Sequence, residues 1–418
     1  MRMSNRFVGG VIAGISACAF WALACTPCAR GDFPAEQYLA RGYFRSPVFS
    51  RDGTRVLTTS GSSSTGVPAV AQLWEVHTGK LLKQFTGHRA TIHSIAFSVD
   101  ETRVLTAAGN NYVVGPQDPT ARVWDTDSGK EVAVLRPGGT YVYSAQFSPD
   151  DDEVLTAYRD TSSSGMPDGV VVWDLKTQKI RLTIAGITEF SKPTRTFEPV
   201  RFSPDGRLLA GLTDDGTQIN LWNAKTGELV WHQEGDLRDA EGTDRHGFGW
   251  LQFSGDGKLL LAVCSDDTAR IWDTRMAQSV RVFASTEGSI LTATFCGDGG
   301  NVMTATRDGT ARLWERATGA LVRRFQHEGP VAELAASRDG KRMIAKWRRL
   351  KEDAERQVWY CSLWDIASGA EIKRFELGSG PHRGLTLSPD GRRILANLDV
   401  SKVYLLDAET GEVLHHYK

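Results

Sequence analysis

Apolar and polar residues alternate over short stretches from residue 45 to the end of the chain, with turn-forming residues between the stretches. Alternation with a period of two predicts β-strands that each bury one face. One recurring pattern is a strand end, a Ser-Pro-Asp-Gly-like turn and an aliphatic strand, as in FSPDGRLLAGL at 202. The other is a strand ending at Trp, a Thr-Gly turn and a further strand, as in ARLWERATGALVRRF at 311. Each pattern occurs eight times in strict alternation, so one unit holds four consecutive strands, which we call a, b, c and d.

A single unit of this kind is a four-stranded antiparallel meander with two apolar faces and little stability alone. Neighbouring units must therefore stack on it, and radial repetition into a ring leaves no end of the stack exposed. The pattern predicts an all-β protein, an eight-bladed β-propeller over residues 45–418, preceded by a lead-in over residues 31–44.

The number of blades follows from the markers at the end of strand c, which recur at similar spacing: Trp74, Trp124, Trp173, Trp222, Trp272, Trp314, Trp364 and Leu406. The last unit contains its own strand d, from Glu412 to Tyr417, and so needs no N-terminal strand to complete it. We therefore expect eight blades, with a seven-bladed ring and one outlying unit as the alternative.

Residues 1–30 have the layout of an export signal. Arg2 and Arg6 precede an apolar run from Phe7 to Ala24, and small residues come just before Cys25. This layout predicts a periplasmic, secreted or envelope-anchored bacterial protein. Three outcomes stay open: a cleaved signal, an uncleaved membrane anchor and lipidation at Cys25. Only this segment is expected to contact a membrane.

Charge and cysteine content restrict the chemistry. The chain has 49 Lys and Arg against 50 Asp and Glu, which argues against nucleic acid as the main partner. Cys25 and Cys28 form a Cys-x-x-Cys at the edge of the apolar run, without the second pair that a zinc site needs. Cys264, Cys296 and Cys361 fall in separate strand-like runs and imply no disulfide framework. No metal or cofactor is predicted.

The segments DGTARLWE at 308, QDPTARVWD at 117 and SDDTARIWD at 265 resemble the WD-repeat family, and the resemblance extends over residues 45–418. In that family a buried tetrad joins a His before strand a, a hydroxyl in strand b, an Asp before strand c and the Trp of strand c. The resemblance implies a complete tetrad only in the second unit, formed by His88, Thr106, Asp118 and Trp124.

Other units depart from this pattern. The sixth unit keeps Thr304, Asp308 and Trp314 without the His, and the seventh keeps His327 and Trp364 but has Ala345 in place of the hydroxyl. We expect these departures to weaken blade rigidity and not to change the fold. A hydrolytic triad uses the same residue types. We favour the structural role, because the family places these groups inside a blade.

Long connections fall only between strands b and c (60–70, 108–118, 158–168 and 346–360) or between strand d and the next strand a (185–199 and 234–247). In a meander these two classes emerge on the same face, where loops on a rigid scaffold can bind a partner. Random drift of tolerant connections is the alternative explanation. Within 346–360, Lys346, Trp347, Arg348 and Arg349 combine an aromatic with basic residues, a composition found at interfaces and also in solvated hairpins.

We therefore expect a non-catalytic protein-interaction scaffold with unidentified protein partners. One alternative is a propeller enzyme of the quinoprotein-dehydrogenase type, although its adjacent cysteine pair and calcium-ligand spacing are absent from the sequence. Another is a periplasmic assembly-factor lipoprotein, an analogy of fold alone.

Overall fold

The structure is a computed structural model that describes residues 47–417, except 63–66, 110–117, 140, 160–168, 186–199, 214–217, 236–247, 265, 286, 298, 351–356, 379–384 and 400–401. The described residues belong to one compact unit of the chain, residues 40–418. The predicted export segment, Cys25 and the lead-in lie outside the described residues. Within the described part there is no helix long and apolar enough to cross a membrane.

The described residues form eight consecutive four-stranded antiparallel meanders, blades 1 to 8. Blades 1 to 4 contain β1 (Val48–Phe49), β2 (Arg55–Ser62), β3 (Val67–Glu75), β4 (Leu81–Thr86), β5 (Thr91–Phe97), β6 (Arg103–Gly109), β7 (Thr120–Asp125), β8 (Glu131–Leu135), β9 (Tyr141–Phe147), β10 (Glu153–Arg159), β11 (Gly169–Asp174), β12 (Lys179–Ala185), β13 (Val200–Phe202), β14 (Leu208–Leu212), β15 (Gln218–Asn223) and β16 (Leu229–Glu234). Blades 5 to 8 contain β17 (Phe248–Phe253), β18 (Leu259–Cys264), β19 (Thr268–Asp273), β20 (Ser279–Ala284), β21 (Ile290–Cys296), β22 (Asn301–Thr306), β23 (Thr310–Glu315), β24 (Leu321–Gln326), β25 (Val331–Ala336), β26 (Arg342–Leu350), β27 (Gln357–Asp365), β28 (Glu371–Gly378), β29 (Leu385–Leu387), β30 (Arg393–Asp399), β31 (Lys402–Asp407) and β32 (Val413–Tyr417).

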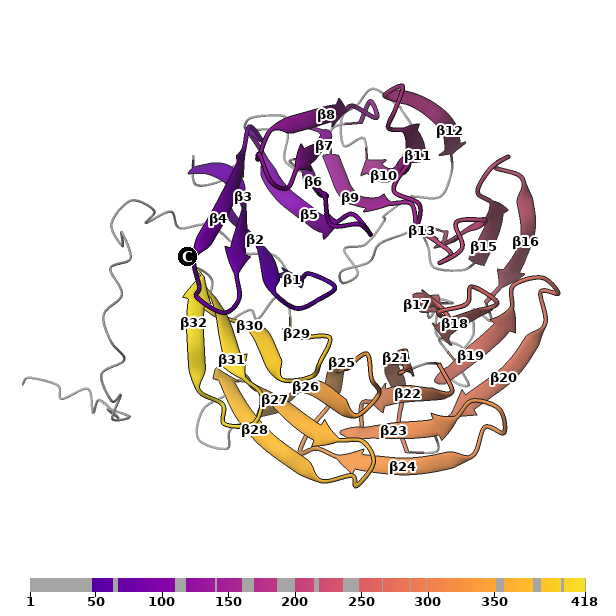
Figure 1. Cartoon of the computed structure of the whole chain (residues 1–418). Helices are drawn as coiled ribbons and strands as arrows, with labels where there is room; N and C mark the ends of the chain where they lie inside the picture. The colour runs from indigo at the N-terminus through magenta and orange to yellow at the C-terminus, as the bar shows by residue number, and fades with distance from the viewer. Residues whose placement is uncertain are drawn as a thin grey trace, which may run out of the picture. The chain divides into compact units, whose positions relative to one another are not determined.

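The blades stand side by side around a centre, with strand a of each blade innermost and strand d outermost (Figure 1). The all-β propeller predicted from the repeats is confirmed, and each repeat unit of the sequence corresponds to one blade. Blades 2 and 3 share one further backbone pairing, between Gly109 and Tyr141. A Cβ at Gly109 would lie 2.8 Å from the Cα of Tyr141, so this approach requires glycine.

The strand-c markers explain why the repeat carries a tryptophan. The marker of each blade packs into the apolar cluster that it shares with the preceding blade, as Trp124 does with Leu57, Leu73 and Phe85 of blade 1. The same holds for Trp173, Trp222, Trp272, Trp314, Trp364 and Leu406. Each marker thus acts as an apolar wedge between two sheets, and its loss would open an interface rather than a single blade.

Closure of the ring repeats the same contact. Trp74 of blade 1 packs with Tyr417 of blade 8, their ring centroids 5.2 Å apart, as Trp124 packs with Phe85 at 5.8 Å. Phe49, Val56, Val403 and Leu405 complete this last cluster. Among the described residues, blade 8 consists of β29 to β32, so it contains its own strand d, as expected (Figure 1).

Candidate functional site

The two faces of the propeller differ in their connections. The a-to-b and c-to-d turns are short and lie together, since the Val76 amide in a c-to-d turn donates to the Thr54 carbonyl in an a-to-b turn. The b-to-c and d-to-a connections start and end at the opposite edge of the blades, and the longest of them join β6 to β7, β10 to β11, β12 to β13 and β16 to β17. We call these the short-turn face and the loop-rich face.

Two of the predicted long loops are wrong. Residues 60–70 and 346–360 are instead mostly strand, because β2 continues to Ser62 with β3 starting at Val67, and β26 continues to Leu350 with β27 starting at Gln357. Arg342 to Leu350 pair in continuous register with Asp365 to Gln357. The alternation of large and charged residues there follows the two faces of a hairpin, not a solvated loop.

Lys346 and Trp347 are therefore not exposed binding residues. Trp347 is 0% exposed, donates its indole N–H to the Ser362 hydroxyl at 2.9 Å and stacks on Tyr360 at 4.5 Å between centroids. Lys346 is 3% exposed and its ammonium contacts Glu333 at 2.7 Å. The predicted aromatic and basic cluster is thus largely part of the interior of blade 7.

Arg348 and Arg349 lie farther along the same strand. Arg348 is half-buried, with its guanidinium 5.7 Å from the centre of the Trp359 ring. Arg349 is exposed and forms an ion pair with Glu328 on the loop-rich face. Of the four predicted residues, Arg349 alone is exposed, and its charge is already balanced within the chain.

The structure brings the four residues of the blade-2 tetrad together. His88 Nε2 lies 2.7 Å from the Thr106 hydroxyl, to which the Trp124 indole N–H donates at 2.9 Å. His88 Nδ1 lies 2.8 Å from Asp118. Trp124 can only donate a hydrogen bond and an ionised Asp118 can only accept one. Trp124 therefore donates to Thr106, the Thr106 hydroxyl donates to His88 Nε2, and His88 Nδ1 donates to Asp118.

Asp118 is ionised in this arrangement, and His88 is neutral. Burial by itself would raise the pKa of Asp118, but hydrogen bonds from His88, the Arg89 amide and Thr120 outweigh it and hold this pKa well below its usual range. Burial lowers the pKa of His88 despite the neighbouring carboxylate. The charge of Asp118 is balanced by Arg122, 3.3 Å away.

The hydrolytic alternative for these residues fails on accessibility. Thr106 is 0% exposed, and its hydroxyl oxygen already contacts His88 and Trp124. A nucleophile must reach a substrate carbonyl. Thr106 is therefore not placed to act as the nucleophile of a hydrolytic triad.

The incomplete tetrads of blades 6 and 7 are rebuilt with other groups. In blade 6 the Trp314 indole donates to Thr304 at 2.9 Å, while Asp308 binds Arg312 at 2.9 Å instead of a histidine. In blade 7, where Ala345 lacks a hydroxyl, the Trp364 indole donates directly to His327 Nε2 at 3.0 Å. The strand-c tryptophan thus has a hydrogen-bond acceptor in both blades.

An arginine missed by sequence reasoning accompanies the tetrad Asp. In the three copies of Asp-x-Thr-Ala-Arg, the arginines Arg122, Arg270 and Arg312 form ion pairs with Asp118, Asp266 and Asp308 respectively. The Thr-Ala-Arg that precedes the strand-c tryptophan in these three blades was the available signal. In an extended strand, residues two apart share a face, which directs the Thr and the Arg back toward the Asp.

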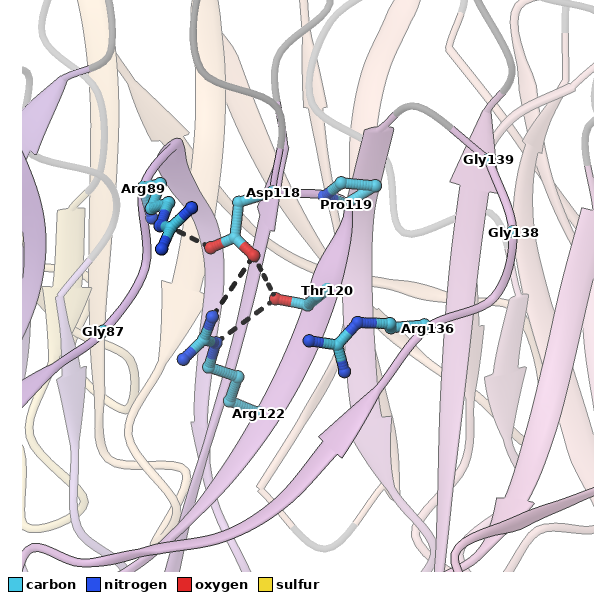
Figure 2. A pocket seen from close by; sticks show the side chains of 9 residues that line it. All are labelled: Gly87, Arg89, Asp118, Pro119, Thr120, Arg122, Arg136, Gly138 and Gly139. Carbon is cyan, nitrogen blue, oxygen red and sulfur yellow. Dashed lines mark hydrogen bonds and ion pairs between the residues drawn. The ribbon is translucent and has the colours of Figure 1, made fainter.

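A pocket of about 550 Å³ opens beside the blade-2 tetrad, between residues 87–89, 118–122 and 136–139. Figure 2 shows three guanidinium groups, those of Arg89, Arg122 and Arg136, around the single carboxylate of Asp118. Arg122 also binds Glu131 at 2.7 Å. Within the described part of the chain, the guanidinium groups of Arg89 and Arg136 bind no carboxylate, so the lining carries excess positive charge.

Metal and thiol chemistry find little support among the described residues. No group of three or more His, Cys, Asp or Glu side chains there is arranged to hold a metal ion. Cys264, Cys296 and Cys361 are buried and are not joined in disulfides. Burial raises the pKa of the Cys264 thiol to about 12, which removes the thiolate needed for reactivity.

Comparison with known proteins agrees with this architecture. Residues 79–125, 246–273 and 277–315 match the family model described as WD domain, G-beta repeat. These segments include strands a to c of blades 2, 5 and 6, which carry the three Asp-x-Thr-Ala-Arg motifs.

Among curated relatives, WD repeat-containing protein 1 of Xenopus tropicalis is 42% identical over 84 residues, 20% of this chain and 13% of that protein. A guanine nucleotide-binding protein subunit beta of Oryza sativa subsp. indica is 27% identical over 284 residues, 66% of this chain and 56% of that protein. The chain thus matches well under two thirds of the length of either relative.

Among solved structures, the C-terminal WD40 domain of Sif2 superposes with a TM-score of 0.65 at 16% identity, covering 87% of this chain and 95% of that domain. The computationally designed Ika8 protein superposes with a TM-score of 0.61 at 17% identity, covering 88% and 96%. With the blade geometry, these similarities show a β-propeller fold, in which three repeats match the WD domain, G-beta repeat model.

Proposed function

We propose that this protein is a non-catalytic scaffold that binds protein partners through its loop-rich face. The observation that carries the proposal is the asymmetry of the connections. Every long connection emerges on the face that also holds the blade-2 pocket, whereas the short-turn face consists of tight turns. A rigid ring that presents variable loops on one side is suited to recognition.

Chemistry within the described residues supports binding rather than catalysis. The His, Thr and Asp of blade 2 satisfy one another in the blade interior, and the described thiols are buried. The relatives whose printed names describe WD-repeat proteins and a guanine nucleotide-binding protein subunit also favour an interaction role.

A photo-crosslinking amino acid at Arg307 tests this proposal. Arg307 is an exposed residue of the b-to-c turn of blade 6, on the loop-rich face. Arg207, with a side chain 80% exposed in an a-to-b turn, is the matched control on the short-turn face. After irradiation in the source cells, we expect covalent protein adducts at position 307 and few at position 207, measured by mass spectrometry. Equal adduct yields at both positions, or none at 307, would reject the proposal.

We also propose that the chain is exported. Support comes from residues 1–30 alone, in which Arg2 and Arg6 precede the apolar run that ends before Cys25. In a bacterial host, the full chain should fractionate with the periplasm, medium or envelope, and deletion of residues 1–30 should leave it in the cytoplasm. The intact mass, together with that of a Cys25→Ser variant, separates cleavage, lipidation and anchoring. Cytoplasmic fractionation of the full chain would contradict export.

A further inference from the structure

The blade-2 pocket differs from its counterparts in blades 6 and 7 at one backbone position. In each of these blades strand a has a bulge directly after its first buried residue, which is Ile92, Ile290 or Val331. The three blades can therefore be aligned on this bulge, which shows the equivalent residue in each blade. Three residues before it lie Arg89 in blade 2, Glu287 in blade 6 and Glu328 in blade 7.

In blades 6 and 7 this position supplies a carboxylate to two arginines. Glu287 binds Arg312 at 2.6 Å and Arg324 at 3.0 Å. Glu328 binds Arg374 at 2.6 Å and also pairs with Arg349. Both glutamates have lowered pKa values, mainly because of the hydrogen bonds donated by these arginines, and are ionised.

Blade 2 keeps the arginine of strand c, but its second carboxylate is Glu131 of strand d, 2.7 Å away, and not a glutamate before strand a. Arg122 corresponds to Arg312, since both end an Asp-x-Thr-Ala-Arg motif and both bind the Asp of that motif. At the position of Glu287 stands a cation, Arg89, and Arg136 adds another from the connection to blade 3. Three guanidinium groups thus border one open space, and among the described lining residues Asp118 is the only one with a carboxylate (Figure 2).

We propose that this pocket binds a carboxylate side chain from an acidic segment of a protein partner, seated against the guanidinium groups of Arg89 and Arg136, with the paired Arg122 beside them. Blades 6 and 7 of the same chain show arginines bound to a glutamate side chain at the equivalent position. Guanidinium groups bind carboxylates with charge-assisted hydrogen bonds of defined geometry. The pocket lies on the loop-rich face, so the inference rests on the proposed scaffold function and names the chemistry of its partner.

Binding of a labelled peptide of alternating glutamate and glycine, followed by fluorescence anisotropy on the full chain at low salt, tests the inference. We expect binding that its glutamine counterpart lacks. The Arg89→Glu variant places in blade 2 a glutamate like those of blades 6 and 7. It should weaken peptide binding by roughly tenfold or more while the fold is retained. Arg136→Glu should weaken it similarly.

Arg207→Glu is the matched control, because it changes the net charge equally on the short-turn face. It should leave the affinity unchanged, and a loss equal to that of Arg89→Glu would show a general charge effect and overturn the proposal. Displacement by inorganic phosphate at a lower concentration than by free glutamate peptide would overturn the assignment to a carboxylate. If the peptide does not bind but crosslinks form at position 307, the proposal for the pocket is rejected and the proposed scaffold function still holds.

Discussion

Replacing Asp118 by alanine should lower the free energy of unfolding by about 3–5 kcal/mol, because it removes the acceptor of a buried charged network. Asp118 is 6% exposed and accepts hydrogen bonds from His88, the Arg89 amide and Thr120. Without it, Arg122 keeps Glu131 but loses its buried partner, and the His88 donor is left unsatisfied. The value is measured by urea unfolding followed by circular dichroism.

Two further variants separate charge from shape. Asp118→Asn retains one acceptor oxygen without the negative charge and should cost less, about 1–3 kcal/mol. Asp127→Ala is the matched control, since Asp127 is exposed in the c-to-d turn of the same blade and should change stability by no more than about 0.5 kcal/mol. If Asp118→Ala and Asp127→Ala lose equal stability, the blade-2 network does not stabilise the fold.

Acidification from pH 6.5 to 4 should destabilise the protein by about 3 kcal/mol through His327 alone. Burial lowers the pKa of His327 from 6.5 to about 4. Between these two values the unfolded chain binds a proton that the folded chain does not, so stability is full above pH 6.5 and is lost as the pH falls to 4. The structural reason is that Nε2 accepts from Trp364 and Nδ1 donates to the Gly309 carbonyl, which leaves no place for a second proton.

The measurement is urea unfolding across this pH range for the natural chain and for His327→Gln. Glutamine can accept from Trp364 and donate to Gly309 without titrating. The groups that face His327, Glu371 and Arg374, are retained, and His88 contributes in the same direction in both proteins. The variant should therefore lose about 3 kcal/mol less than the natural chain on acidification. Identical pH profiles would assign the acid sensitivity to other groups.

Strand periodicity predicted most of the fold, and its failure at residues 346–360 has a clear cause. In the sequence alone, the alternate residues Lys346, Arg348 and Leu350 resemble part of a charged loop. Its burial depends on residues far along the chain, since Tyr360 stacks on Trp347 and the Arg374 guanidinium lies 5.1 Å from the centre of the same ring. A pattern of neighbouring residues cannot predict such partners on other strands.

Candidate sites divide in the same way. The blade-2 tetrad could be predicted because the family motif names His88, Thr106, Asp118 and Trp124 one by one. The cationic pocket could not be predicted, because only the strand register shows that Arg89 occupies the position of Glu287 and Glu328.

By itself the sequence determined what repeats: four strands per unit, eight units, a wedge residue in each and one complete tetrad. These properties arise from local alternation, turn chemistry and motif spacing. The tertiary structure alone decided that Tyr417 closes the ring on Trp74, that His327 takes over the role of a missing hydroxyl, and that three arginines share one space in blade 2. Each of these depends on contacts between residues distant in sequence, whose geometry is set when the blades pack.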